Sequence, residues 1–210
     1  MTHSLHRRGS TESLRGDYVL IARTSRVNKA AVAPGLSKVA EIILEVGVSN
    51  TGSSVLETNF PLGMDREEFV RRIPTAHGLL CSFSSKEKLA EVLRRLKEAD
   101  LGLSITVSGL LDEVIPLAQE MGIKPHTANL SMGILGRTDK LADEETLEFT
   151  TMCGHALIAA NLVKKGISDV ARGAKTPREA SDMIGAPCVC GIYNLDRSGL
   201  LLRERAESAK

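Results

Sequence analysis

The 210-residue chain has few aromatic residues and no excess of charge of either sign. Tryptophan is absent and aromatic residues make up 3% of the chain, so aliphatic side chains must form the core. The same scarcity leaves no obvious row of aromatic rings on which nucleic-acid bases could stack. Lys and Arg number 27 against 26 Asp and Glu, so the net charge of +1 gives no general attraction to nucleic acid or anionic membranes. We therefore expect no nucleic-acid partner.

Long apolar runs are also missing. No stretch approaches 18 consecutive apolar residues, and no apolar segment follows the basic residues near the N-terminus. We expect a cytoplasmic protein that does not bind membranes. The four cysteines are too few for the disulfide framework of a secreted protein of this length, so in a reducing compartment they are thiols or metal ligands.

The apolar pattern predicts strands alternating with helices. Short apolar runs at residues 18–22, 78–84, 103–109 and 126–136 predict strands. Apolar residues three and four apart predict helices that begin near Pro34, Asp65, Ser84 and Val114. The last of these contains Pro116, which fits a helix only in its first turn.

This alternation predicts an α/β protein of the α+β sandwich type, with ferredoxin-like or related βαβ layers and a mainly helical C-terminal third. Periodicity alone does not separate a split βαβ arrangement from successive parallel crossovers. No repeat or low-complexity tract interrupts the pattern. We therefore predict a polar N-terminal arm over residues 1–16 and a single globular domain over residues 17–210.

The C-terminal third begins with an acidic helical turn at Asp143. The apolar pattern that follows is interrupted at Gly154, a residue that readily leaves helical geometry. The threonines at 150 and 151 can cap a new helix, so we predict that the helix restarts near Cys153.

Two further helices carry clear capping signals. Thr176, Pro177 and Glu179 occupy the N-cap, first and third positions of a helix that should end at Gly185. Asn194 is placed to cap the final helix, which carries the last leucines of the chain.

Three of the four cysteines lie in two turns that contain glycine, Cys153-Gly154-His155 and Cys188-Val189-Cys190-Gly191. On an extended segment, residues two apart point to the same side, so Cys188 and Cys190 can share one metal. Cys153 and His155 can converge only where the backbone leaves the helix, which Gly154 permits. Thiolate and imidazole ligands suit a soft metal ion or an iron-sulfur cluster. We therefore predict a metal site formed by Cys153, His155, Cys188 and Cys190.

The same residues allow other interpretations. In the first turn of a helix the thiolate of Cys153 would be stabilised as a nucleophile, with His155 as its acid or base partner. A strained disulfide between Cys188 and Cys190 could act as a redox switch. All three cysteines could instead be buried structural residues, which is how we interpret Cys81 in its apolar strand.

The N-terminal arm contains His3, His6, Arg7 and Arg8 directly before the first predicted strand. Histidines could complete a site built by the cysteines, and arginines could hold an anionic substrate. We predict these four residues as substrate-binding, against the alternative of a disordered basic leader.

The segment "MCGHALIA", residues 152–159, resembles the segment around the first catalytic cysteine of the proline racemase family. The resemblance covers eight residues, and "APCVCGIYN" does not match the second cysteine motif of that family. It implies an activated thiol at Cys153 at the beginning of a helix.

These observations lead to three functional hypotheses. The leading one is a metal- or iron-sulfur-binding protein, expected to be an enzyme with Cys153 and His155 as catalytic residues and a small-molecule or anionic substrate. The second is a metal-independent cysteine enzyme with Cys153 as nucleophile. The third is a ferredoxin-like small-molecule-binding or regulatory module with structural cysteines. Assembly into a homo-oligomer is left open by each of them.

Overall fold

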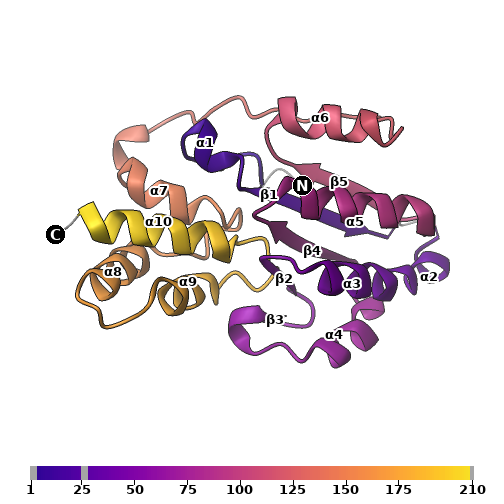
Figure 1. Ribbon diagram of the computed structural model, residues 1–210, viewed down its shortest axis with the longest axis horizontal. Coiled ribbons are helices and arrows are strands. Elements are labelled where there is room, and N and C mark those ends of the chain that lie inside the picture. Colours follow the sequence, from indigo (N-terminus) through magenta and orange to yellow (C-terminus); the bar gives the residue numbers. More distant parts are fainter. Residues whose placement is uncertain (1–3, 25–27, 209–210) are drawn as a thin grey trace.

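The computed structural model describes residues 4–24 and 28–208, which form a mixed α/β fold. Five antiparallel strands form one sheet in the order β3-β2-β4-β1-β5. Their bounds are β1 Tyr18–Arg23, β2 Asn50–Ser53, β3 Thr58–Asn59, β4 Gly78–Phe83 and β5 Ser104–Ser108. Figure 1 shows the sheet beside α3 and α5, with the helices α7 to α10 gathered at the other end of the molecule.

Strand β1 is buried on both faces because two separate apolar cores meet at it. Tyr18, Leu20 and Ala22 point into a core formed with α3 (Gly35–Val46) and α5 (Lys86–Ala99). Val19 and Ile21 point to the opposite face, into a core formed with the C-terminal helices. Alternation of side chains along a strand sends neighbouring residues to opposite faces, so a continuous apolar run serves both cores.

The predicted capping signals of the sheet half are largely confirmed. Helix α3 ends at Gly47, whose φ of 84° is left-handed. Asp65 caps α4 (Arg66–Arg72) by accepting a hydrogen bond from the backbone N–H of Glu68. The cap of α5 is Ser85 and not Ser84, because the Ser85 hydroxyl accepts from the backbone of Lys88.

The remaining elements of this half are several short helices and the longer helix α6, which follows β5. They are α1 Thr11–Leu14, α2 Lys29–Val32, η2 Phe60–Leu62, η3 Ile73–Thr75, α6 Leu111–Glu120 and η4 Thr138–Lys140. Pro116 lies in the sixth position of α6, so its predicted place in the first turn is wrong. The carbonyl that loses its helical partner belongs to Asp112, an exposed residue whose backbone water can solvate.

The C-terminal part is helical, with α7 Glu144–Thr150, α8 Ala160–Ala171, α9 Pro177–Gly185 and α10 Leu195–Ser208. The capping box of α9 is present as predicted, with Thr176 and Glu179 each bonded to the other's backbone. The predicted cap of α10 is also confirmed, since the Asn194 side chain accepts a hydrogen bond from the backbone of Arg197 at 3.1 Å.

Two predictions in this half of the chain are wrong. Residues 126–136 form no strand, because Gly133 and Gly136 adopt left-handed φ angles of 85° and 91° and the segment lies exposed. The helix does not restart near Cys153 but at Ala160, since Ala156 adopts a left-handed φ of 56° that a helix cannot contain. Among the described residues, no helix is long and apolar enough to span a membrane.

Candidate thiol site

Three cysteines meet where two loops of the helical part face the sheet. Cys153 lies in the loop between α7 and α8, and Cys188 and Cys190 lie in the loop between α9 and α10. All three belong to the core that covers Val19 and Ile21 of β1, and none is more than 2% exposed. The fourth cysteine, Cys81, is buried in the other core and donates to the carbonyl of Leu20 at 3.8 Å, as expected for a structural thiol.

The two loops place thiols and an imidazole in direct contact. The sulfur atoms of Cys188 and Cys190 are 3.8 Å apart, and Cys190 Sγ lies 3.6 Å from Nδ1 of His155. His155 itself is exposed, whereas the three cysteines that it adjoins are buried. The extended segment expected for Cys188 and Cys190 is not present. These residues lie in a turn in which the N–H of Gly191 donates to the carbonyl of Cys188 at 2.9 Å, and this turn brings the two sulfur atoms into contact.

The sulfur of Cys153 is surrounded by donors. A hydrogen bond from the Cys188 thiol, followed by backbone N–H groups of Leu157 and His155, lowers the pKa of Cys153 to about 6 despite its burial. This stabilisation does not come from a helix N-terminus, which was the predicted cause. Cys153 follows the C-terminal end of α7, where the helix dipole opposes a negative charge.

Cys190 has a similar environment, and Cys188 has the opposite one. A hydrogen bond from Cys188 and the backbone N–H of Ile192 lower the pKa of Cys190 to about 6. The pKa of Cys188 is raised well above its ordinary value because its proton is shared with the thiols on either side. Hydrogen bonding to Cys153 and Cys190, together with burial, therefore favours the protonated form of Cys188 and the thiolate form of its neighbours.

Arg7 from the N-terminal arm joins the two cysteine loops. Its guanidinium forms an ion pair with Asp17 and donates to the backbone carbonyls of Met152, at 3.1 Å, and Ile192. Met152 directly precedes Cys153, and Ile192 lies two residues after Cys190. One buried side chain, 6% exposed, therefore fixes both loops against the end of β1.

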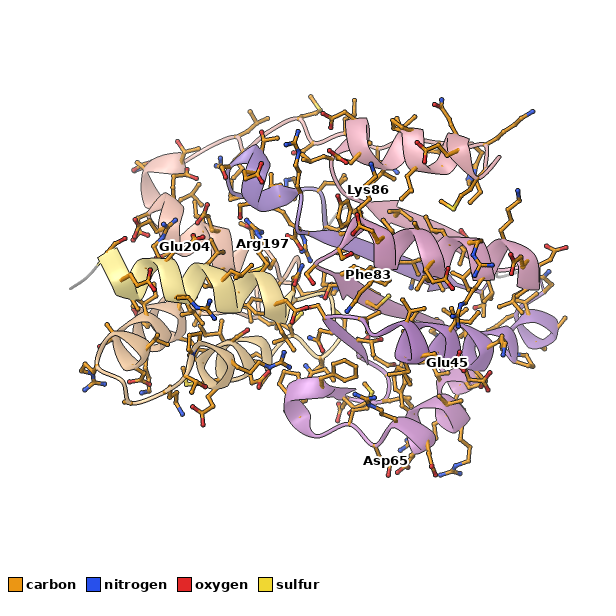
Figure 2. All side chains as sticks on the ribbon, in the orientation of Figure 1. Glu45, Asp65, Phe83, Lys86, Arg197 and Glu204 are labelled. Atoms are coloured by element: carbon orange, nitrogen blue, oxygen red, sulfur yellow. The ribbon has the colours of Figure 1, made fainter. Side chains whose placement is uncertain are left out.

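A second arginine completes this polar cluster. Arg197 of α10, which is labelled in Figure 2, pairs with Asp17 at 2.8 Å and donates to the carbonyl of Arg8 at 2.6 Å. Asn194 also donates to Asp17, at 3.0 Å. Two buried arginines share one carboxylate, so the cluster carries a net positive charge beside the cysteine loops.

Two asparagines of the sheet hold the loop that contains Cys188 and Cys190. Asn59 donates to the carbonyls of Ala186 and Cys188 at 3.1 and 2.9 Å. Asn50 donates to the carbonyl of Tyr193 at 3.2 Å. Both asparagines are fully buried, and neither was predicted as part of the site, although a buried asparagine in a short strand needs such partners.

The same loop lies directly on the backbone of β2. Gly191 has a φ of 76°, and a Cβ atom there would lie 2.1 Å from the carbonyl carbon of Thr51. Only glycine accommodates both the left-handed backbone and this close approach. Gly191 is therefore required for the turn that aims Cys190 into the cluster.

The residues predicted to bind substrate are dispersed. His3 lies outside the described residues. His6 lies 3.2 Å from the hydroxyl of Ser131, and the Arg8 side chain lies 3.8 Å from Glu144. Arg7 pairs with Asp17 and donates to two backbone carbonyls, so its observed contacts are all within the protein. Substrate binding by these four residues stays a prediction.

Within residues 4–24 and 28–208, no group of three or more His, Cys, Asp or Glu side chains already has the arrangement that holds a metal ion. The cluster is thus a set of adjacent contacts and not a closed cage. No protein-family model, curated protein or solved structure matches this chain.

Proposed function

We propose that the chain is a cytoplasmic metal-binding enzyme whose metal is held by Cys153, Cys188, Cys190 and His155. One observation carries the proposal. Zinc bonds of about 2.3 Å to sulfur and about 2.0–2.1 Å to nitrogen, at tetrahedral angles, separate two sulfurs by about 3.8 Å and a sulfur and a nitrogen by about 3.6 Å. The contacts among Cys188, Cys190 and His155 have these lengths, 3.8 and 3.6 Å.

These distances favour a single ion over an iron-sulfur cluster, because they correspond to two edges of one tetrahedron. Binding would replace the proton of Cys188 by the metal, since hydrogen bonding to Cys153 and Cys190 favours the protonated form of Cys188 before the metal binds. It would also require the Cys153 thiol to turn toward the other three ligands, because the group is not yet arranged around one point.

The charge around the site supports the same proposal. Three thiolates and one divalent ion carry a net charge of −1, which needs compensation in a buried environment. The cluster of Arg7, Arg197 and Asp17 supplies a net positive charge and is bonded to the backbone next to Cys153 and Cys190. This pairing lowers the cost of burying the anionic metal-thiolate group.

Catalytic use is proposed because His155 lies at the exposed side of the site, where a small anionic substrate can approach. A catalytic metal keeps one position for substrate or water, so catalysis here requires His155 to leave the metal and act as an acid or base from the exposed side. The fold supporting it is proposed to be ferredoxin-like. The order β2-β4-β1-β5, with α3 after β1 and α5 after β4, supports that assignment.

The test is elemental analysis of protein purified without oxygen, with sulfide measured alongside zinc and iron. We expect one metal per chain and no sulfide. The double variant of Cys188→Ser and Cys190→Ser should lose the metal, and Cys81→Ser is the matched control because Cys81 is equally buried in the other core. A folded, metal-free protein that takes up no added zinc would refute the proposal.

The metal-independent cysteine enzyme remains the second candidate because Cys153 has a pKa of about 6. It predicts that, in protein that binds no zinc, iodoacetamide modifies Cys153 before Cys81 and Cys188, with the labelled residues identified by mass spectrometry. Cys190 has a similarly lowered pKa, so its labelling does not distinguish the hypotheses. The module with structural cysteines predicts a third result, in which the double serine variant loses stability without any change in bound metal.

A further inference from the structure

A cavity of about 870 Å³ lies along β5, an edge strand of the sheet. Its walls are formed by β5, α6, the C-terminal half of α5 and residues 123–131, and the N-terminal arm contributes Ser4, Leu5 and Arg7. Figure 1 shows α6 and β5 at the opposite end of the molecule from α8 and α9. Cavities of roughly 300–1,000 Å³ are the usual size for small-molecule sites.

The two sides of β5 give the cavity two kinds of wall. Ile105 and Val107 pack with α5 and α6 on one face of the sheet. Ser104, Thr106 and Ser108 alternate with them and pair with β1 residues on the opposite face. The cavity is lined by both sets, so a ligand along this edge meets an apolar wall and a row of hydroxyl groups.

The charged groups of the cavity sum to a positive charge. Arg7 and Asp17 neutralise each other as an ion pair. Lys97 of α5 also lines the cavity and donates to the carbonyl of Met121 at 2.6 Å. In the part of the chain that the structure describes, Lys97 forms no ion pair and bonds to a neutral carbonyl, so no carboxylate neutralises its charge.

A long irregular segment covers the cavity. Residues 121–137 contain neither helix nor strand, and residues 125–131 of this segment contribute to the wall. Three of its large apolar side chains are exposed, Leu130 by 71%, Met132 by 89% and Leu135 by 80%. Irregular segments of this length within a compact domain commonly cover binding sites, and their apolar residues gain burial when a ligand is bound.

We propose that this cavity binds an amphipathic carboxylic acid. Its unbranched apolar chain lies against Ile105, Val107 and α6, its carboxylate pairs with Lys97, and the segment 121–137 closes over it. None of the four proposed metal ligands lines the cavity, so binding does not depend on a metal, although Arg7 lines the cavity and also holds the cysteine loops.

The experiment is calorimetric titration with hexanoate, octanoate and decanoate below the concentrations at which they form micelles, with decanol as the neutral probe. Each methylene that becomes buried should tighten binding by up to about fourfold. Lys97→Met should weaken decanoate binding about fivefold and leave decanol binding unchanged. Lys88→Met is the matched control, since Lys88 lies on the same helix outside the cavity.

Three results would overturn the proposal. Affinity that does not rise from hexanoate to decanoate would exclude an apolar chain in the cavity. Equal decanoate affinity of the Lys97→Met and Lys88→Met variants would exclude the assigned carboxylate position. A dimer in analytical ultracentrifugation, together with no binding of decanoate, would overturn the proposal in favour of a cavity covered by a second copy of the chain. Zinc content should be the same in both variants, which separates this test from that of the thiol site.

Discussion

Arg7 is the residue whose replacement tests the architecture of the thiol site most directly. Arg7→Met keeps an unbranched apolar stem and removes the guanidinium with its charge and every donor. Asp17 retains Arg197 and Asn194, so its carboxylate is not left alone. The carbonyls of Met152 and Ile192 lose the guanidinium that bonds to them, and the buried arm loses its ion pair.

The expected cost can be estimated from these losses. Each buried carbonyl left without a donor costs about 1–3 kcal/mol, and breaking a buried ion pair from one side costs about 3–5 kcal/mol. The two effects overlap because they involve the same side chain, and Asp17 keeps partners. We therefore expect Arg7→Met to reduce the free energy of unfolding by about 3–5 kcal/mol.

Arg8→Met is the matched control. Arg8 is the next residue, but its side chain is 35% exposed and lies 3.8 Å from Glu144, which is 72% exposed. Such a pair contributes at most about 1 kcal/mol. Its backbone contacts to Thr151 and Arg197 survive the substitution.

The assay is urea denaturation followed by far-ultraviolet circular dichroism, because the chain has no tryptophan. Zinc content of the same samples reports whether the loops still meet. If Arg7→Met and Arg8→Met lowered the unfolding free energy by similar amounts, or if Arg7→Met retained full zinc affinity, Arg7 would not be the residue that joins the loops.

Two further predictions concern the loops themselves. Gly191→Ala should lower the free energy of unfolding, measured by urea denaturation, by about 3 kcal/mol or more, because the new Cβ would collide with the β2 backbone. Gly173→Ala is the control, since Gly173 has a φ of 70° but open space around it, and should lower the free energy of unfolding by only about 1–2 kcal/mol. Equal losses in the two variants would contradict the close approach at Gly191. In metal-free protein, thiolate absorbance should rise through pH about 6 and lose amplitude in Cys153→Ser but not in Cys81→Ser. The pKa of both thiols in the folded protein lies below the ordinary value of 9.0, so their ionisation adds stability above pH about 9, and this contribution decreases as the pH falls and is lost at about pH 6. Thiolate absorbance that rises only above pH about 8 would refute the arrangement.

The elements that could be predicted from the sequence were those specified by neighbouring residues. The capping box at Thr176, the cap at Asp65 and the end of α3 at Gly47 each involve groups within about one helical turn, so the local pattern is sufficient. Residues 126–136 were predicted as a strand from apolar content alone, but a strand also requires a partner and a backbone without left-handed glycines.

The candidate site was predictable only in part for a related reason. The two glycine-containing turns and their cysteines are visible as short motifs, and the structure brings Cys188, Cys190 and His155 together. The groups that bring them together come from distant parts of the chain. The hydrogen bonds of Arg7 join residues 145 and 185 positions apart in the sequence, and that of Asn59 to Cys188 joins residues 129 positions apart. A local sequence pattern does not predict such pairs. Arg7 was predicted to bind substrate because the sequence does not distinguish an arginine that binds an anion from one that donates to backbone carbonyls.

The origin of these contacts also bears on what a metal would do here. Arg7, Asn50 and Asn59 hold the cysteine loops by their backbone carbonyls, and Gly191 seats one loop on β2. None of these contacts uses a sulfur atom, and two aliphatic cores on either face of the sheet supply the burial that folding needs. In small metal-dependent folds the metal replaces such a core, so ligand loops collapse without it. Here the loops are positioned by the protein itself, so we expect them to stay folded when the proposed metal is removed.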